Sequence, residues 1–336
     1  MTWLSLGSLA LPHQLQRQGV SLRAEMSRLG VELTTGQSSN PQKKLRGDVG
    51  PLAAIEARLS RIDAYEQNAR VVVGRVNTTQ TTMSKLDSSR SQIMSSMLAA
   101  SMVGGAADSL VNAGASAKAA LQDAISALSV RVAGQAVFSG VATDRDPLVD
   151  AETMLAAVVP LVNGFNSAQD VATTVNSAFT DPGGLFETAF YQGVGSAPEA
   201  MIDDGSPELA LPTAADPAVR ELLAGLVTAA LVAEPSMSLQ QGQRRQLAQS
   251  SAEALLGNAG AMTGVQARIG DAQARLDTQL LQFSTERDAL TLSRGALVGV
   301  DPYEAATRLE EARTQLETLY TVTARTSRLS LTGYLR

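Results

Sequence analysis

The chain has 336 residues, of which 44% are hydrophobic, 4% are aromatic and none is cysteine. Disulfides and thiolate metal sites are therefore excluded, and large pockets lined by aromatic side chains are not expected. The net charge of −6 is unevenly spread: 15 basic against 12 acidic side chains in residues 1–150, 1 against 11 in 151–240, and 11 against 10 in 241–336. Nearly neutral ends suit close packing of many copies. An acidic middle suits a solvent-facing projection, or simply an acidic, loop-rich domain.

The apolar segments and the N-terminal residues bear on membranes and export. No apolar run reaches the ~20 residues of a membrane span, so no membrane insertion is expected. The N-terminus lacks the basic start and the apolar core of a cleaved signal peptide. If the chain leaves the cell, we expect a route that reads no standard signal peptide.

Both ends of the sequence have the pattern of amphipathic helices. Asp301 can accept hydrogen bonds from first-turn amides, Pro302 suits the first helical position, and Glu304 completes a capping-box pattern. Apolar or small residues recur in both terminal segments at alternating four- and three-residue steps, which is the spacing of a coiled-coil seam. We expect these seams to form an assembly interface made of Leu15, Leu22, Met26, Leu29, Leu33, Leu309, Ala312, Leu316, Leu319 and Leu331.

Longer helices are predicted inside the two ends. Helical spacing of apolar residues covers residues 52–102, and an alanine-rich helix is expected over 106–134 after the Gly104-Gly105 break. Apolar residues then recur every seven residues over 269–297, which is a strict heptad. A long helix docked on a globular core is the alternative. The expected rod core is Ile55, Leu59, Ile62, Ile269, Leu276, Phe283 and Leu290.

The middle of the chain has the pattern of a small globular domain. Asp216-Pro217 begins a helix whose apolar face is too wide for a coiled-coil seam. Residues 180–184 predict a turn, and 201–211, with Asp-Asp-Gly-Ser between short apolar segments, predicts a hairpin. Residues 34–51 are rich in Gly, Ser, Asn and Pro and predict a loop.

Catalytic and metal-binding interpretations find little support. His13 is the only histidine, so a catalytic triad or a zinc site lacks partners. Residues 203–206 (Asp-Asp-Gly-Ser) lack the further spaced acids of an EF-hand and are interpreted as a turn. The basic cluster at residues 43–46 is too small for a nucleic-acid footprint on an acidic protein. We expect no enzyme activity, no cofactor, no metal and no nucleic-acid partner.

Three separated motifs resemble segments of one known family. They are RLGVELTTGQSSNP at residues 28–41, AVFSGVATDRDPL at 136–148 and RTSRLSLTGYL at 325–335. The first is similar to the signature after the first helix of flagellin-related proteins. The other two resemble a domain boundary and the tail of the member of that family found at the hook–filament junction. The chain departs from the family at residues 48–51, where Asp-Val-Gly-Pro replaces a double acid before proline, which concerns the path of the first loop.

The resemblance implies a structural adaptor at the hook–filament junction of the bacterial flagellum, required for filament attachment and swimming motility. It implies ring-forming self-association, contacts with a companion hook-associated junction protein and with the hook end or flagellin, and a flagellar export chaperone. It also implies an extracellular location, reached by type III export without a cleaved signal peptide. A flagellin filament subunit and a coiled-coil scaffold are the alternatives, because long heptad helices fit all three.

Together, the patterns and the resemblance predict a mainly α fold. We expect a long antiparallel helical rod or coiled coil formed by the N- and C-terminal segments, with a small inserted α+β domain. The predicted domains are terminal assembly helices at 1–35 and 300–336, a helical rod at 36–140 and 241–299, and a small acidic outer domain at 141–240.

Overall fold

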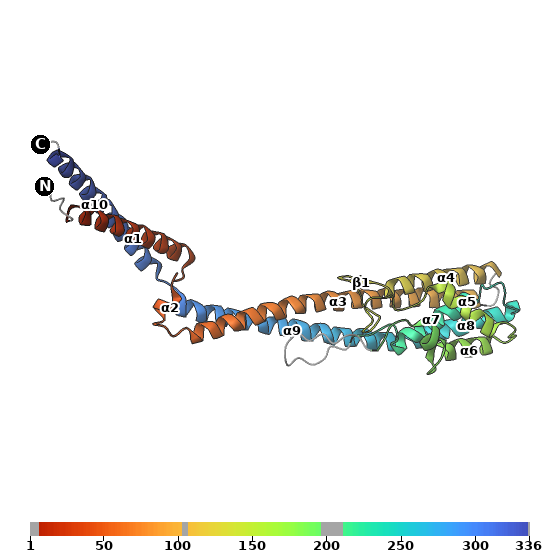
Figure 1. The fold of residues 1–336 in the computed structure, drawn as a ribbon. Coiled ribbons are helices and arrows are strands. Elements are labelled where there is room, and N and C mark those ends of the chain that lie inside the picture. The colour runs from red at the N-terminus through yellow and green to blue at the C-terminus, as the bar shows by residue number, and fades with distance from the viewer. Residues whose placement is uncertain (1–6, 103–106, 196–210, 335–336) are drawn as a thin grey trace. The chain divides into compact units, whose positions relative to one another are not determined.

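The computed structural model describes residues 7–102, 107–195 and 211–334, and its fold is mainly helical (Figure 1). Long helices and a very small sheet confirm the predicted mainly α class. The elements are α1 (Gly7–Thr35), α2 (Pro41–Lys44), α3 (Gly50–Ser101), α4 (Ala107–Leu128), β1 (Arg131–Val132), β2 (Gln135–Ala136), α5 (Ala151–Val162), α6 (Ala168–Thr180), the π-helix η1 (Phe186–Phe190), α7 (Pro217–Leu231), α8 (Gln241–Gly257), α9 (Ala259–Val298) and α10 (Pro302–Tyr334).

Two compact units divide the chain. The terminal unit contains residues 1–63 and 283–336, and the central unit contains residues 64–282. The helices α3 and α9 contribute to both units, so this division differs from the three parts expected from the sequence. That those three parts have separate roles stays a prediction.

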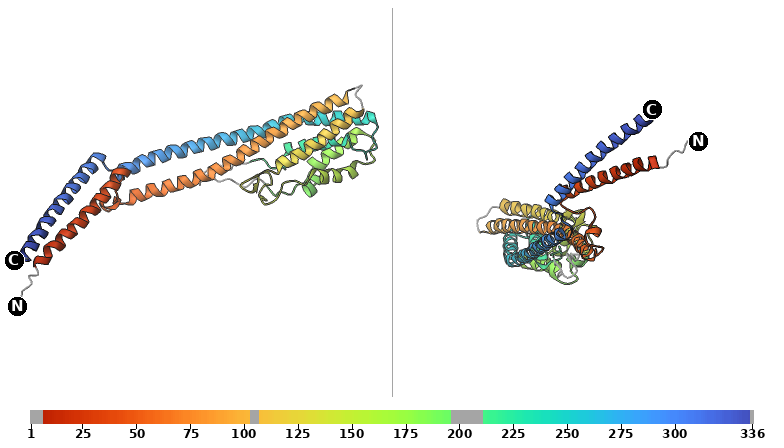
Figure 2. Two further views of the ribbon diagram at one scale, coloured as in Figure 1. Left: turned by 90° about the horizontal axis from the view of Figure 1, so that it is seen from above. Right: turned by 90° about the vertical axis from the view of Figure 1, so that its left-hand side faces the viewer.

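In the terminal unit, two pairs of helices lie side by side. Helix α1 packs along α10, and the left view of Figure 2 shows the two helices side by side. The start of α3 pairs with the end of α9 through ion pairs, among them Glu56–Arg294 at 3.5 Å and Asp63–Arg287 at 3.6 Å. Residue numbers rise along α3 as they fall along α9, so the two helices run antiparallel.

The start of α10 shows one expected cap and one departure. The Tyr303 amide donates a 2.8 Å hydrogen bond to Asp301 Oδ1, as the sequence predicts. The Glu304 carboxylate, however, lies 2.7 Å from Arg308 Nη2 and is turned along the helix. Glu304 therefore forms an i, i+4 ion pair instead of the reciprocal contact of a capping box.

The central unit is built around α7, which α4, α6 and α8 contact. The Ala218 amide donates to Asp216 Oδ1 at 3.1 Å, so the expected cap begins this helix. The wide apolar face is buried at every expected position, namely Val219, Leu222, Leu223, Leu226, Val227 and Leu231. Phe179 and Phe190 pack with ring centroids 5.4 Å apart and add a buried aromatic cluster that the composition did not predict.

The helix predicted over residues 106–134 is too long. Helix α4 ends at Leu128, and β1 and β2 form a hairpin in which Arg131 pairs with Ala136 and Val132 with Gln135. Ala133 (φ 51°) and Gly134 (φ 80°) occupy the left-handed conformation that a two-residue hairpin turn requires. The alanine-rich pattern did not show where α4 ends, because alanine has a high helix propensity at most positions.

Three other expectations have mixed outcomes. The turn at 180–184 is present, since α6 ends at Thr180 and Gly183 has a φ of 74°. The loop predicted over 34–51 is too wide, because α1 extends to Thr35, α3 begins at Gly50, and α2 lies between them. Residues 201–210 of the predicted hairpin and the Gly104-Gly105 break lie outside the described residues.

The expected rod-core residues fall into both units. Ile62 is fully buried and Phe283 is 3% exposed, whereas Ile55, Leu59 and Leu290 are half-buried. In the central unit, Ile269 and Leu276 are each 1% exposed. The buried residues follow the predicted heptad, and their role in a flagellar rod stays a prediction.

Candidate assembly surface and loop clasp

The predicted seams of α1 and α10 face each other. Leu29 is 1% exposed and Ala312 is 5% exposed, so both are fully covered. A Cβ added at Gly19 would lie 3.3 Å from Leu319 Cδ2, which shows that the two helices approach closely at this glycine. The remaining expected interface residues on this seam are half-buried and keep part of their apolar surface in solvent; they are Leu15, Leu22, Met26, Leu309, Leu316 and Leu319.

Two expected interface residues are not on the described seam. Leu33 is 36% exposed, and its neighbour Glu32 is buried in its place at 5%. The coiled-coil spacing predicts the wrong buried residue here. Glu32 has polar partners in the following loop, and the spacing of apolar residues gives no sign of them. Leu331 belongs to α10, but its side chain lies outside the described residues.

A polar contact between α1 and α10 accompanies the apolar seam. Arg23 donates to the Tyr320 hydroxyl from both Nη2, at 2.7 Å, and Nε, at 3.1 Å. The guanidinium carbon also lies 5.7 Å from the centre of the Tyr320 ring. A planar guanidinium can satisfy both contacts at once, so this pair fixes the facing positions of the two helices.

A groove of about 520 Å³ lies between α1 and α10. We call it the terminal groove, and its apolar lining includes Leu15, Leu22, Leu319 and Val322. Val322, which lines the groove, is 44% exposed. Apolar surface of this kind, concentrated on two helices, is typical of a site that another protein covers.

Hydroxyl side chains in the terminal groove do not make it polar. Thr314 and Thr318 line it, but their hydroxyls donate to the carbonyls of Glu310 (3.0 Å) and Thr314 (2.9 Å) in the preceding turn. The Ser21 hydroxyl likewise donates to the Gln18 carbonyl at 2.9 Å. Since these hydroxyls are satisfied within their own helices, the threonines offer methyl groups to a partner.

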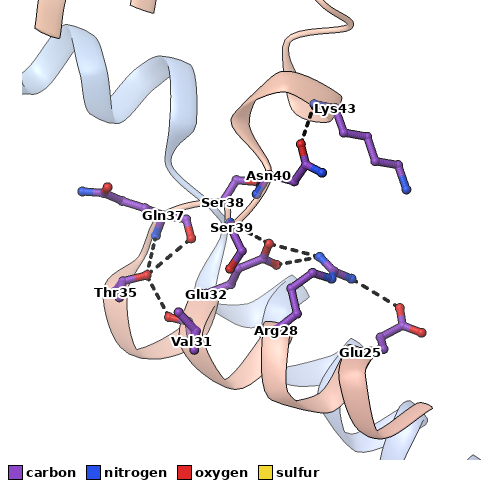
Figure 3. A network of polar contacts seen from close by, with 10 residues as sticks. All are labelled: Glu25, Arg28, Val31, Glu32, Thr35, Gln37, Ser38, Ser39, Asn40 and Lys43. Carbon is purple, nitrogen blue, oxygen red and sulfur yellow. Dashed lines mark hydrogen bonds and ion pairs between the residues drawn. The ribbon is translucent and has the colours of Figure 1, made fainter. Parts of the chain in front are cut away.

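The loop after α1 is held by a buried carboxylate, as Figure 3 shows. Glu32 Oε1 accepts a 2.9 Å hydrogen bond from the Ser39 amide and a 3.0 Å bond from Arg28 Nη1. Arg28 also reaches Glu32 Oε2 at 3.1 Å and Glu25 at 3.4 Å. One carboxylate therefore ties the last turn of α1 to the chain that leads into α2.

The same loop pairs with the segment between α9 and α10. The Ser38 amide donates to the Val298 carbonyl at 2.8 Å, and the Val300 amide donates to the Gly36 carbonyl at 2.9 Å. These two bonds flank an antiparallel bridge between Gln37 and Gly299. We call this bridge, together with the Arg28–Glu32–Ser39 contacts, the loop clasp.

Glycines make the loop clasp possible at two points. Gly36 has a φ of 67°, a left-handed conformation that lets the chain turn directly after α1. A Cβ at Gly299 would fall against the Gly295 carbonyl oxygen, so only glycine fits there without movement. Lys44 Nζ donates to the Gly299 carbonyl and adds a third link between the two connecting segments.

The described residues offer little that is chemically reactive. They hold no group of three or more His, Asp or Glu side chains that could bind a metal ion. His13 is exposed on α1, and residues 203–206 lie outside the described part. Within the same described ranges, no helix is both long and apolar enough to cross a membrane.

Comparison with known proteins bears on the helices just described. Residues 254–335, which include α9 and α10, match the family model of the bacterial flagellin C-terminal helical region. The C-terminal segment of this chain is flagellin-like. The match covers these C-terminal helices only, and it points to a structural protein related to the bacterial flagellum. A comparison with curated proteins gives no match.

The sequence patterns missed the polar contacts of this site. Arg28 and Glu32 stand four residues apart on α1, a spacing that indicates an ion pair but not burial. No sequence pattern indicated the contact between Arg23 and Tyr320, because it depends on the packing of segments 297 residues apart.

Proposed function

We propose that the protein is a structural adaptor at the hook–filament junction of the bacterial flagellum, similar to flagellar hook-associated protein 3. The match over residues 254–335 supports a flagellar structural protein. The finer assignment is supported by the motifs at 136–148 and 325–335, which resemble the junction member more than flagellin. The observation that carries the proposal is the flagellin-like α10 paired with α1 beside an apolar groove.

In this proposal, the terminal groove and the half-buried seam residues are the assembly interface. Copies of the chain pack through α1 and α10 into a ring, which then contacts the companion hook-associated junction protein and the hook end or flagellin. The half-exposed Leu15, Leu22, Leu316 and Leu319 become buried on assembly. The groove threonines lose no solvent hydrogen bond from their hydroxyl hydrogens when the groove is covered, whereas the Gln18 and Gln315 amides that also line it need partners on the other surface.

The proposal also covers export and the outer parts of the chain. The unassembled chain travels through the type III pathway with a flagellar export chaperone and without a cleaved signal peptide. Residues 141–240 form an acidic outer domain whose net charge keeps it in solvent. The long helices of 36–140 and 241–299 form the rod that carries it.

Deletion of the gene tests this function. Cells without the protein are expected to build hooks, to lack attached filaments and to shed flagellin into the medium, and complementation restores swimming. Cells that keep attached filaments would overturn the adaptor role. A flagellin filament subunit is the second candidate, favoured by the family named in the match. In that case the deletion removes the filament protein itself, and another flagellin does not accumulate outside the cell.

A further inference from the structure

The apolar seams of α3 and α9 repeat so regularly that they leave the register of the two helices open. On α3, Ile55, Ile62, Ala69, Val76 and Met83 lie seven residues apart, and on α9 the same interval separates Ile269, Leu276, Phe283, Leu290 and Leu297. A shift of one helix by seven residues therefore brings apolar positions opposite apolar positions again. Differences in side-chain size oppose such a shift, but the pattern alone does not exclude it.

Two of the ion pairs in the terminal unit repeat in the same way. Glu56 and Asp63 are seven residues apart on α3, and their partners Arg294 and Arg287 are seven apart on α9. After a seven-residue shift, Glu56 stands opposite Arg287 in one direction, or Asp63 opposite Arg294 in the other. One acidic–basic pair of the same kind thus forms in either shifted register. Both contacts, at 3.5 and 3.6 Å, are also longer than a good hydrogen bond.

The ion pair between Arg58 and Glu286 does not repeat in this way. Arg58 Nε and Nη2 lie 2.6 and 2.8 Å from the two oxygens of Glu286, a bidentate arrangement. The positions seven residues from Glu286 are Gln279 and Ser293, and those seven residues from Arg58 are Pro51 and Tyr65. A shifted helix therefore offers neither Arg58 nor Glu286 an opposite charge at the matching position.

We propose that the Arg58–Glu286 pair sets the register of α3 against α9 in the terminal unit. The apolar seam and the other two ion pairs hold the helices together, while this pair selects one alignment among those that the seven-residue repeat allows. A bidentate Arg–carboxylate contact suits this role, because its fixed geometry is lost with any displacement along the helix. The inference concerns this chain alone and does not depend on the flagellar function.

Cysteine cross-linking tests the proposal, because the natural chain contains no cysteine. The variant with Asp63→Cys and Arg287→Cys reports the present register, and the variant with Glu56→Cys and Arg287→Cys reports a seven-residue shift. A short thiol-to-thiol cross-linker joins the pairs, since a direct disulfide needs closer Cα atoms than long ion-paired side chains provide. The measured quantity is the ratio of shifted to present cross-link.

Glu286→Gln is the test substitution in both reporters, and Asp288→Asn is the matched control that removes a nearby negative charge from the same helix. Glu286→Gln is expected to raise the ratio by about 1.4- to 5-fold, the range that corresponds to one well-formed exposed ion pair. Asp288→Asn leaves it unchanged. Exchanging the charges, with Arg58→Glu and Glu286→Arg together, returns the ratio toward its original value.

The outcomes separate clearly. A ratio that Glu286→Gln leaves unchanged, or that Asp288→Asn raises equally, would overturn the proposal, as would a charge exchange that restores nothing. If Glu286→Gln lowers the helix content measured by circular dichroism, the cross-linking is repeated with Arg58→Lys as the test substitution. Lysine keeps the charge but not the bidentate geometry, so a smaller rise in the ratio is expected and an unchanged ratio contradicts the role of that geometry.

Discussion

The Ser39 amide donates to the Glu32 carboxylate across 2.9 Å, and this single bond joins the last turn of α1 to the loop that pairs with Val298 and Val300. Glu32 is only 5% exposed, so its charge is compensated chiefly by Arg28 and by this amide. The Glu32 carboxylate therefore contributes to holding the loop after α1, together with the backbone bonds of the loop clasp.

Glu32→Ala is expected to loosen the loop clasp. The substitution leaves the Ser39 amide without its acceptor and Arg28 without its main partner, and such losses typically cost about 1–3 kcal/mol. Hydrogen exchange of the Ser38, Ser39 and Val300 amides should become faster. Glu25→Ala is the control, because Glu25 contacts the same Arg28 at 3.4 Å from an exposed position. Equal exchange rates in the two variants would contradict this account of the clasp.

Two glycines four residues apart in sequence should respond in opposite ways to alanine. A Cβ at Gly299 meets the Gly295 carbonyl oxygen, so Gly299→Ala forces the clasp apart and should lower the free energy of unfolding by about 1–3 kcal/mol. A Cβ at Gly295 has nothing within 4 Å, and alanine favours the helix by up to ~1 kcal/mol. Urea unfolding followed by circular dichroism measures both changes. A stabilising Gly299→Ala would show that the contact is relaxed in solution.

Two substitutions at Thr318 test the shape and the polarity of the terminal groove separately. Thr318→Val keeps the shape and removes a hydroxyl that already donates to its own helix, so assembly and swimming should be nearly unchanged. Thr318→Asp places a charge in the groove and should block incorporation into flagella, while the helix content of the purified monomer stays the same. Swimming assays and immunoblots of isolated flagella measure the effect. Incorporation of the aspartate variant at the level of the valine variant would exclude the groove as an interface.

The contribution of Glu286 to stability should vanish in acid. Its hydrogen bond from Arg58, and then the charges of Arg58 and Arg61, hold the pKa of Glu286 below its ordinary value of 4.5. A lowered pKa in the folded state means that the ionised form is stabilised above the unfolded value and that this stability is lost as pH falls through the folded value. Wild type should therefore exceed Glu286→Gln in stability by about 0.2–1 kcal/mol near pH 7, because the pair is partly exposed.

This difference should shrink as the pH is lowered from about 4.5, and it should also shrink in high salt at neutral pH. Denaturant unfolding of the two proteins across the pH range provides the measurement. A difference that stays constant down to pH 2 would mean that the ion pair contributes nothing to the folded state.

Patterns within one helix were predictable from the sequence, and contacts between segments were not. The caps at Asp216 and Asp301 and the buried heptad positions Ile269, Leu276 and Phe283 follow from local spacing and side-chain chemistry. The burial of Glu32 in place of Leu33 could not be predicted from local spacing, because it depends on a loop amide seven residues away.

The end of α4 shows a second limit of the sequence patterns. Residues 129–136 continue an alanine-rich helical segment, yet Arg131 to Ala136 form a hairpin with an Ala-Gly turn. The usual Asn-Gly or Asp-Gly turn signal is missing, so the residues themselves carry no clear sign of a hairpin. The loop clasp could not be predicted from the sequence either, since it joins residues near 38 and 299 through backbone groups that every sequence shares.

Locating the protein on intact flagella tests the adaptor function most directly. An epitope inserted after Gly164, in the exposed loop between α5 and α6, and detected by immunogold electron microscopy on isolated flagella from swimming cells, reports where copies of the chain reside. The adaptor account predicts gold at one narrow band between hook and filament. Gold spread along the filament would contradict it in favour of a filament subunit, and flagella without gold would exclude both in favour of a scaffold elsewhere.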